Sequence, residues 1–144
     1  MKDLNKKLTI NYYAVYFAAV ILAVLGYFLK ENNLIIENAK IIEIIRYVFI
    51  LYILISIPLT LKFFSVQVKK IAKIENETLK IAKYLQVSII RIWLIATNLL
   101  LGILFVYVLY QPDNRFDMLY FAAIGAVALF FCRPTKQKTE TDLK

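Results

Sequence analysis

Polar side chains inside long apolar stretches are the residues of this sequence that are best placed to do chemistry. Asn98 adjoins Thr97 about 13 Å into one such stretch, at the helical rise of 1.5 Å per residue. An amide at that depth needs a hydrogen-bond partner, and Ser56, or the backbone carbonyl freed by Pro58, lies at a comparable depth in another stretch. Such bonds between membrane helices contribute about 0.6–2 kcal/mol. We therefore expect a structural clamp, with a polar pore lining as the alternative.

Glu43 and Arg46 are the second candidate pair. They are three residues apart, so on a helix they share one surface. Arg46 lies about 8 Å from the nearer end of its apolar stretch, a distance that an arginine side chain can span. The favoured interpretation is an ion pair that sets the depth of the helix. The alternatives are a contact for an anion or substrate, or an enzyme site that combines Glu43, Arg46 and a tyrosine.

The residue types that familiar sites require are scarce. The chain has no histidine, one cysteine (Cys132) and three glycines. Common metal sites therefore lack ligands, a glycine-rich phosphate loop cannot be built, and no serine or cysteine nucleophile stands near a base. We expect no metal and no cofactor. Familiar enzymes are disfavoured, although a membrane enzyme that uses only Arg, Asn and Tyr side chains stays open.

Four apolar stretches must position these residues. They cover residues 10–29, 41–64, 89–110 and 116–132. A bilayer core requires about 20 helical residues, with about 17 as the minimum. The predicted fold is an all-α integral membrane protein, an antiparallel four-helix transmembrane bundle that forms one domain over 1–144. The alternative, a soluble helical core, predicts a polar face on each helix, yet residues 14–29 carry no charge and 61% of the chain is hydrophobic.

The distribution of Lys and Arg predicts the orientation. Fourteen of the 18 cations fall on one side: on the two termini, on the connection between the second and third stretches, and at the ends of those two stretches next to it (Lys62 and Arg91). Short segments rich in Lys and Arg stay in the cytoplasm. Both termini and the middle connection are therefore predicted to be cytoplasmic. The compact length and the lack of targeting signals favour a bacterial inner membrane.

The middle connection, residues 65–88, contains no Gly or Pro. Its apolar positions recur at spacings of three and four and continue through Ser88, Ile92, Ile95 and Leu99. This pattern predicts one continuous helix that extends the third stretch into the cytoplasm. Its other face is basic, with Lys69, Lys70, Lys73, Lys80 and Lys83. The favoured role of that face is to determine topology; the alternative is a contact with anionic lipid or a protein partner. Nucleic-acid binding is not expected.

Small residues mark places where helices approach closely. One set lies on the first stretch and consists of Ala19, Ala23 and Gly26; the other lies on the fourth and consists of Ala122, Gly125 and Ala126. The two faces are expected to pack on one another, or one of them to mediate self-association.

The function that these features favour is non-enzymatic. We expect a small membrane protein that acts through helix packing, as an accessory, assembly or regulatory subunit of another membrane protein or as a homo-oligomer. A small oligomeric transporter or channel lined by Asn98, Thr97, Ser56 and Arg46 is the first alternative. A membrane enzyme at the outer interface is the second.

Overall fold

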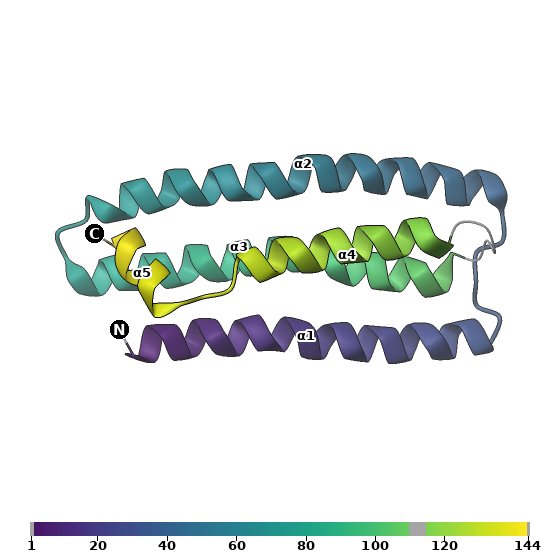
Figure 1. The fold of residues 1–144 in the computed structure, drawn as a ribbon, viewed down its shortest axis with the longest axis horizontal. Helices are drawn as coiled ribbons and strands as arrows, with labels where there is room; N and C mark the ends of the chain where they lie inside the picture. Colours follow the sequence, from purple (N-terminus) through teal and green to yellow (C-terminus); the bar gives the residue numbers. More distant parts are fainter. Residues whose placement is uncertain (1, 110–114, 144) are drawn as a thin grey trace.

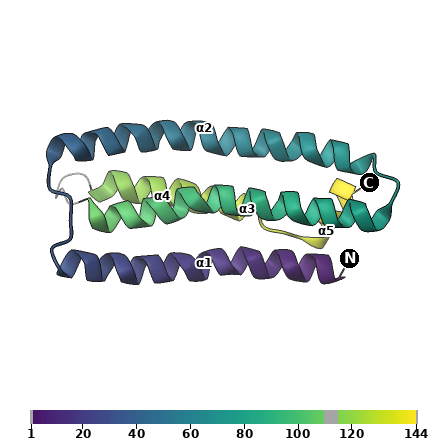
Figure 2. The ribbon, with the colours of Figure 1, turned by 180° about the vertical axis from the view of Figure 1, so that it is seen from behind.

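The computed structural model describes residues 2–109 and 115–143, and these form five α-helices joined by short connections. The helices are α1 (Lys2–Glu31), α2 (Ala39–Ala72), α3 (Glu77–Val108), α4 (Arg115–Phe131) and α5 (Lys136–Leu143). The expected all-α class is confirmed. The long helices lie side by side, and the first and last helices meet near the turn between α2 and α3 (Figures 1 and 2).

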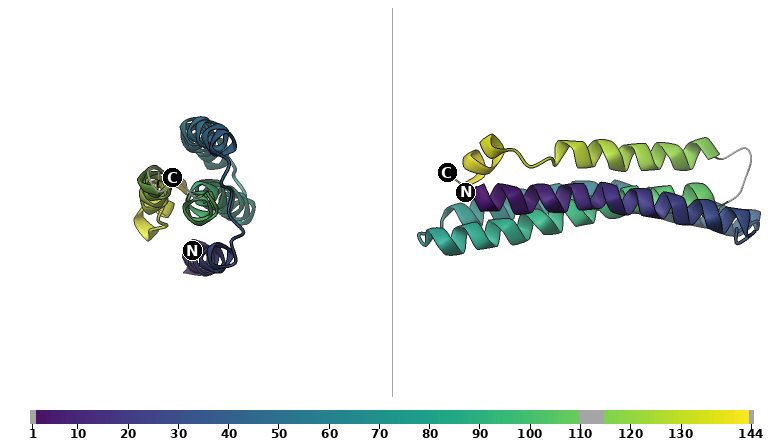
Figure 3. Two further views of the ribbon diagram at one scale, coloured as in Figure 1. Left: turned by 90° about the vertical axis from the view of Figure 1, so that its right-hand side faces the viewer. Right: turned by 90° about the horizontal axis from the view of Figure 1, so that it is seen from below.

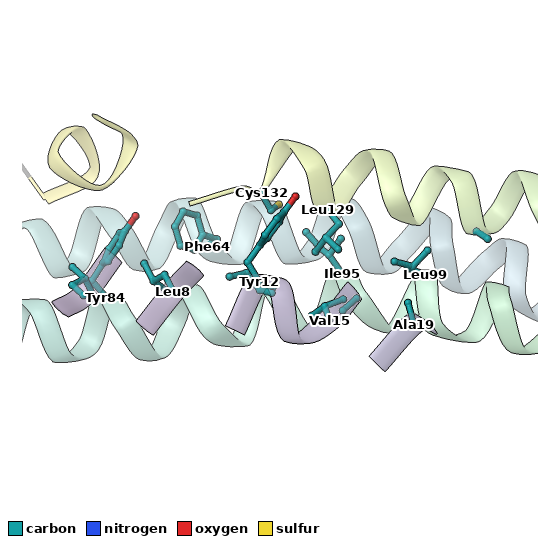
Figure 4. Close-up of a cluster of buried hydrophobic side chains, with 14 of the residues drawn as sticks. Leu8, Tyr12, Val15, Ala19, Phe64, Tyr84, Ile95, Leu99, Leu129 and Cys132 are labelled. Atoms are coloured by element: carbon teal, nitrogen blue, oxygen red, sulfur yellow. The ribbon is translucent and has the colours of Figure 1, made fainter. Parts of the chain in front are cut away.

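Helix α3 occupies the centre of the structure. It packs against α1, α2 and α4, whereas α2 and α4 barely touch (Figure 3). The buried positions of α3 include Tyr84, Ser88, Ile92, Ile95 and Leu99, and those of α1 include Leu4, Leu8, Tyr12, Val15 and Ala19. Both sets repeat at spacings of four and three, so each helix presents one continuous stripe to the other. Figure 4 shows this core, to which Leu129 of α4 and Cys132, the residue that follows α4, contribute.

Asparagines define three helix boundaries. Asn33 has a φ of 56°, and the amides of Asn33 and Leu34 donate to the carbonyls of Lys30 and Leu29. This hydrogen-bond pattern satisfies the last carbonyls of α1. Asn38 and Asn76 cap the first turns of α2 and α3 through their side-chain oxygens.

The prediction of one continuous helix through residues 65–88 is wrong. Helix α2 continues to Ala72, the chain turns, and α3 begins at Glu77. The side chain of Asn76 accepts hydrogen bonds from the backbone amides of Thr78 and Leu79, so it supplies a helix start without Gly or Pro. The third helix does extend beyond its apolar stretch, as expected, by the twelve residues from Glu77 to Ser88.

Three helices, α1, α2 and α3, are each long and apolar enough to cross a membrane. Helix α4 with α5 makes a fourth candidate if this pair, bent by 67°, counts as one span. Within the most apolar windows of the three long helices, only 17–33% of the residues are buried. Most of their apolar surface therefore faces outward, which suggests a membrane protein.

The two small-residue faces do not form a joint interface, which corrects that expectation. Gly26 of α1 is so close to Tyr107 of α3 that a Cβ atom would lie 2.8 Å from its ring. Gly125 of α4 lies against the backbone of α3, where a Cβ atom would come within 2.7 Å of the Leu99 nitrogen. Each small-residue face thus allows α3 to approach closely, and both faces take part in packing within the chain. Ala19 and Ala122 are buried in the same packing.

Candidate functional site

Two hydrogen-bonded pairs link α2 to α3 in the middle of the apolar region. The Tyr52 hydroxyl lies 2.9 Å from Thr97 Oγ1, and Ser56 Oγ donates to Asn98 Oδ1 at 2.9 Å. The Thr97 hydroxyl donates to the Leu94 carbonyl at 2.6 Å. Because a hydroxyl has one proton, Tyr52 is left as the donor to Thr97. These four residues, two per helix, are called the polar clamp below.

Asn98 is the most enclosed member of the polar clamp. Its side chain has no exposed surface, and its Nδ2 atom lies 3.3 and 3.4 Å from the carbonyl oxygens of Leu94 and Ile95. Both ends of the amide are therefore engaged. Of the two partners considered for Asn98, the structure selects Ser56. Sequence reasoning missed Tyr52, although it precedes Ser56 by four residues and therefore shares its helix face.

Glu43 and Arg46 lie apart from the polar clamp. Glu43 is exposed and Arg46 is half-buried, in the first quarter of α2. Ten residues separate Arg46 from Ser56, which is about 15 Å along a helix. The five polar candidates thus occupy two places rather than one site. The ion pair between Glu43 and Arg46 stays a prediction.

A second polar cluster holds α5 against the other helices. Tyr84 of α3 donates to Asp142 Oδ2 at 2.8 Å, and Thr139 Oγ1 lies 3.0 Å from Asn5 Oδ1 of α1. Burial, reinforced by the hydrogen bond to Asp142, raises the pKa of Tyr84 to about 12. The raised pKa of Tyr84 reflects a hydroxyl that is held in its protonated, donating form. No spacing in the sequence relates residues this far apart, so this cluster was not predicted.

An apolar groove of about 560 Å³ lies between α2 and α4. Its walls include Ile57 and Leu61 of α2 and Ala123 and Val127 of α4. One cation, Arg91 of α3, lies among the lining residues. The Arg91 guanidinium carbon is 3.6 Å from the centre of the Phe64 ring, a cation–π contact. A smaller groove of about 370 Å³ lies between α2 and α3 and includes Val48 and Tyr52.

The predicted basic face surrounds the turn between α2 and α3. Lys69, Lys70, Lys73 and Lys83 are exposed, and Lys80 is half-buried. They lie at the same end of the molecule as α5 (Figure 1). Their positions suit a contact with a charged surface, but they form no enclosed pocket with the polar clamp.

The chemistry available to these sites is hydrogen bonding and charge attraction. Over the described ranges, no three His, Cys, Asp or Glu side chains gather closely enough to hold a metal ion. The polar clamp engages its own groups, and the α2–α4 groove offers apolar walls with one guanidinium. Comparison with known proteins finds no family model, no curated protein and no solved structure that matches this chain.

Proposed function

We propose that this chain is an integral membrane protein of four spans that acts through helix packing, as an accessory or assembly subunit of a membrane complex or as a homo-oligomer. The observation that carries the proposal is the polar clamp. Its hydroxyl and amide groups bond to one another between α2 and α3, with Asn98 fully enclosed. Groups used in this way stabilise a helix pair rather than line a path for a solute.

Two features support placement in a bilayer with both termini in the cytoplasm. Large apolar side chains are exposed along α1 and α2; Phe17 is 70% exposed and Leu54 is 64% exposed. Such surfaces are unfavourable in water and suited to lipid. The Lys and Arg bias toward one end supports the cytoplasmic assignment of that end. The compartment that we propose is the inner membrane of a bacterium.

Helix α2 is the element best placed to contact another protein. It lies at the periphery, packs mainly on α3, and is flanked by the two apolar grooves. Its exposed face includes Ile44, Val48 and Leu51. A helix of a partner, or α2 of a second copy, would bury this face without rearranging the core.

Photo-crosslinking in native membranes tests this role. A benzophenone side chain at Val48 of α2 should give an adduct with one defined membrane protein or with a second copy. The matched control is Val20 of α1, which has a similar exposure (62% against 60% for Val48) and should give only lipid adducts. A chain that is monomeric in native mass spectrometry, gives no Val48 protein adduct and supports flux or turnover alone in liposomes would reject the proposal.

A further inference from the structure

Arg91 is a charged side chain whose hydrogen bonding is incomplete among the described residues. Its guanidinium stacks on Phe64, and its Nε atom is buried with no hydrogen-bond partner among the residues that the structure describes. A buried cationic donor without an acceptor is costly. The side chain also lines the groove between α2 and α4, so it places a cation beside any anionic group that enters this groove.

The groove is a few ångströms longer than one lipid leaflet. It extends along α4 from Tyr120 to Cys132, which is about 18 Å at 1.5 Å per residue. Half of a bilayer core is about 15 Å thick. Arg91 and Cys132 lie at the end nearer α5, and the rest of the lining is largely apolar, with Leu61, Ile124 and Val127 among its residues. A cation at one end of an apolar channel complements an amphiphile with an anionic head.

We propose that the α2–α4 groove binds one anionic glycerophospholipid of the cytoplasmic leaflet, with an acyl chain between the helices and its phosphate accepting from Arg91. The inference rests on the membrane insertion proposed above and adds a ligand to it. Arginine suits this role because its planar guanidinium can offer two parallel N–H donors to a phosphate. The exposed lysines at the same end would attract anionic lipid in general, whereas the groove would hold one molecule.

Native mass spectrometry of the full chain, released from nanodiscs that contain phosphatidylglycerol and phosphatidylcholine, tests the site. One phosphatidylglycerol per chain should be retained in preference to phosphatidylcholine. Arg91→Gln should lower this retention about tenfold, as expected for loss of a charge-assisted hydrogen bond, and Arg91→Lys should restore part of it. Lys136→Gln, which removes an exposed charge at the same end, is the matched control and should change it little.

A groove-filling variant separates the lipid from other occupants and does not depend on Arg91 for folding. Ala123 is exposed in the groove, and Ala123→Phe should displace the acyl chain; Val20→Phe on α1 is the control. Retention unchanged by Arg91→Gln or by Ala123→Phe overturns the proposal. Two other results also overturn it. One is inorganic phosphate that displaces the lipid equally from the unchanged chain and from the Ala123→Phe variant, and the other is a second copy of the chain that excludes lipid from the groove. A chain that never enters nanodiscs contradicts membrane insertion itself, a separate result.

Discussion

Single side chains in this protein are constrained most strongly where two helices meet around a polar group. Removing Ser56 Oγ leaves Asn98 Oδ1 without its donor in an apolar surrounding. The Asn98 amide then destabilises the folded protein instead of joining the two helices. The physical reason is that Asn98 is fully buried, so no water molecule can act as a substitute partner. The contribution of the polar clamp to the stability of the protein is therefore measured by substituting its members singly and together.

Ser56→Ala and Asn98→Leu should each destabilise the protein, and the double variant should lose less than the sum. The coupling energy should be about 0.6–2 kcal/mol, the range for hydrogen bonds between membrane helices. Reversible unfolding in mixed micelles would measure it. Ser65→Ala, an exposed serine on the same helix, serves as the control. A coupling energy near zero would contradict the assignment of this pair as a clamp.

At Gly125, the addition of one methyl group should force α4 away from α3. A Cβ atom there would meet the Leu99 nitrogen at 2.7 Å and its Cα at 2.9 Å, and a backbone cannot move aside as a flexible side chain can. Gly125→Ala should therefore cost about 1–3 kcal/mol through overpacking. Thermal unfolding in detergent would detect the loss, with Leu119→Ile on the exposed side of α4 as the comparison. Equal stability of the two variants would contradict the close contact between Gly125 of α4 and the backbone of α3.

Among the helices, α5 depends most on a few polar contacts. It has eight residues, too few to be stable alone in water, and its sequence is strongly polar. Its position rests on the hydrogen bond from Tyr84 to Asp142, on Thr139 beside Asn5, and on Leu143 against the core. Helix α5 lies at the same end of the molecule as the N-terminal part of α1.

Tyr84→Phe should loosen α5 while α3 stays intact. The lost hydrogen bond to a carboxylate is worth about 1.5 kcal/mol or more, which corresponds to about tenfold less protection of the α5 amides. Hydrogen exchange followed by mass spectrometry of residues 136–143 would report it. Tyr13→Phe, an exposed tyrosine on α1, should have no effect on α5. Unchanged protection in Tyr84→Phe would mean that apolar contacts alone hold this helix.

For the molecule as a whole, the testable property is its orientation in the bilayer. In a Cys132→Ala background, a cysteine at Asn33 should react with an impermeant maleimide added outside intact cells. Cysteines at Glu75 and Glu140 should react only after permeabilisation. The Glu140 position separates four spans from three, because with three spans the C-terminal segment would lie outside. Labelling of Glu140→Cys in intact cells would overturn the four-span arrangement; the packing of α5 beside α1 argues for the expected result.

Part of this architecture was predictable because the length of an apolar stretch and the depth of a residue along a helix can be read from nearby residues in the chain. They placed α4 within one residue at each end, and depth along the helices selected Asn98 and a short list of partners, among them Ser56. The break between α2 and α3 was missed because Asn76 starts a helix with its side chain alone. That signal is weaker in a sequence than Gly or Pro.

The amino-acid sequence by itself determined which long segments are apolar, which residues are small, and where the charges gather, because each of these follows from side chains near one another in the chain. Only the tertiary structure decided that α3 is the central helix, that both small faces pack on it, and that Arg91 lies in a groove between α2 and α4. The physical reason is that helix pairing depends on the fit of whole surfaces. Many pairings satisfy the same periodicity, and close packing selects among them.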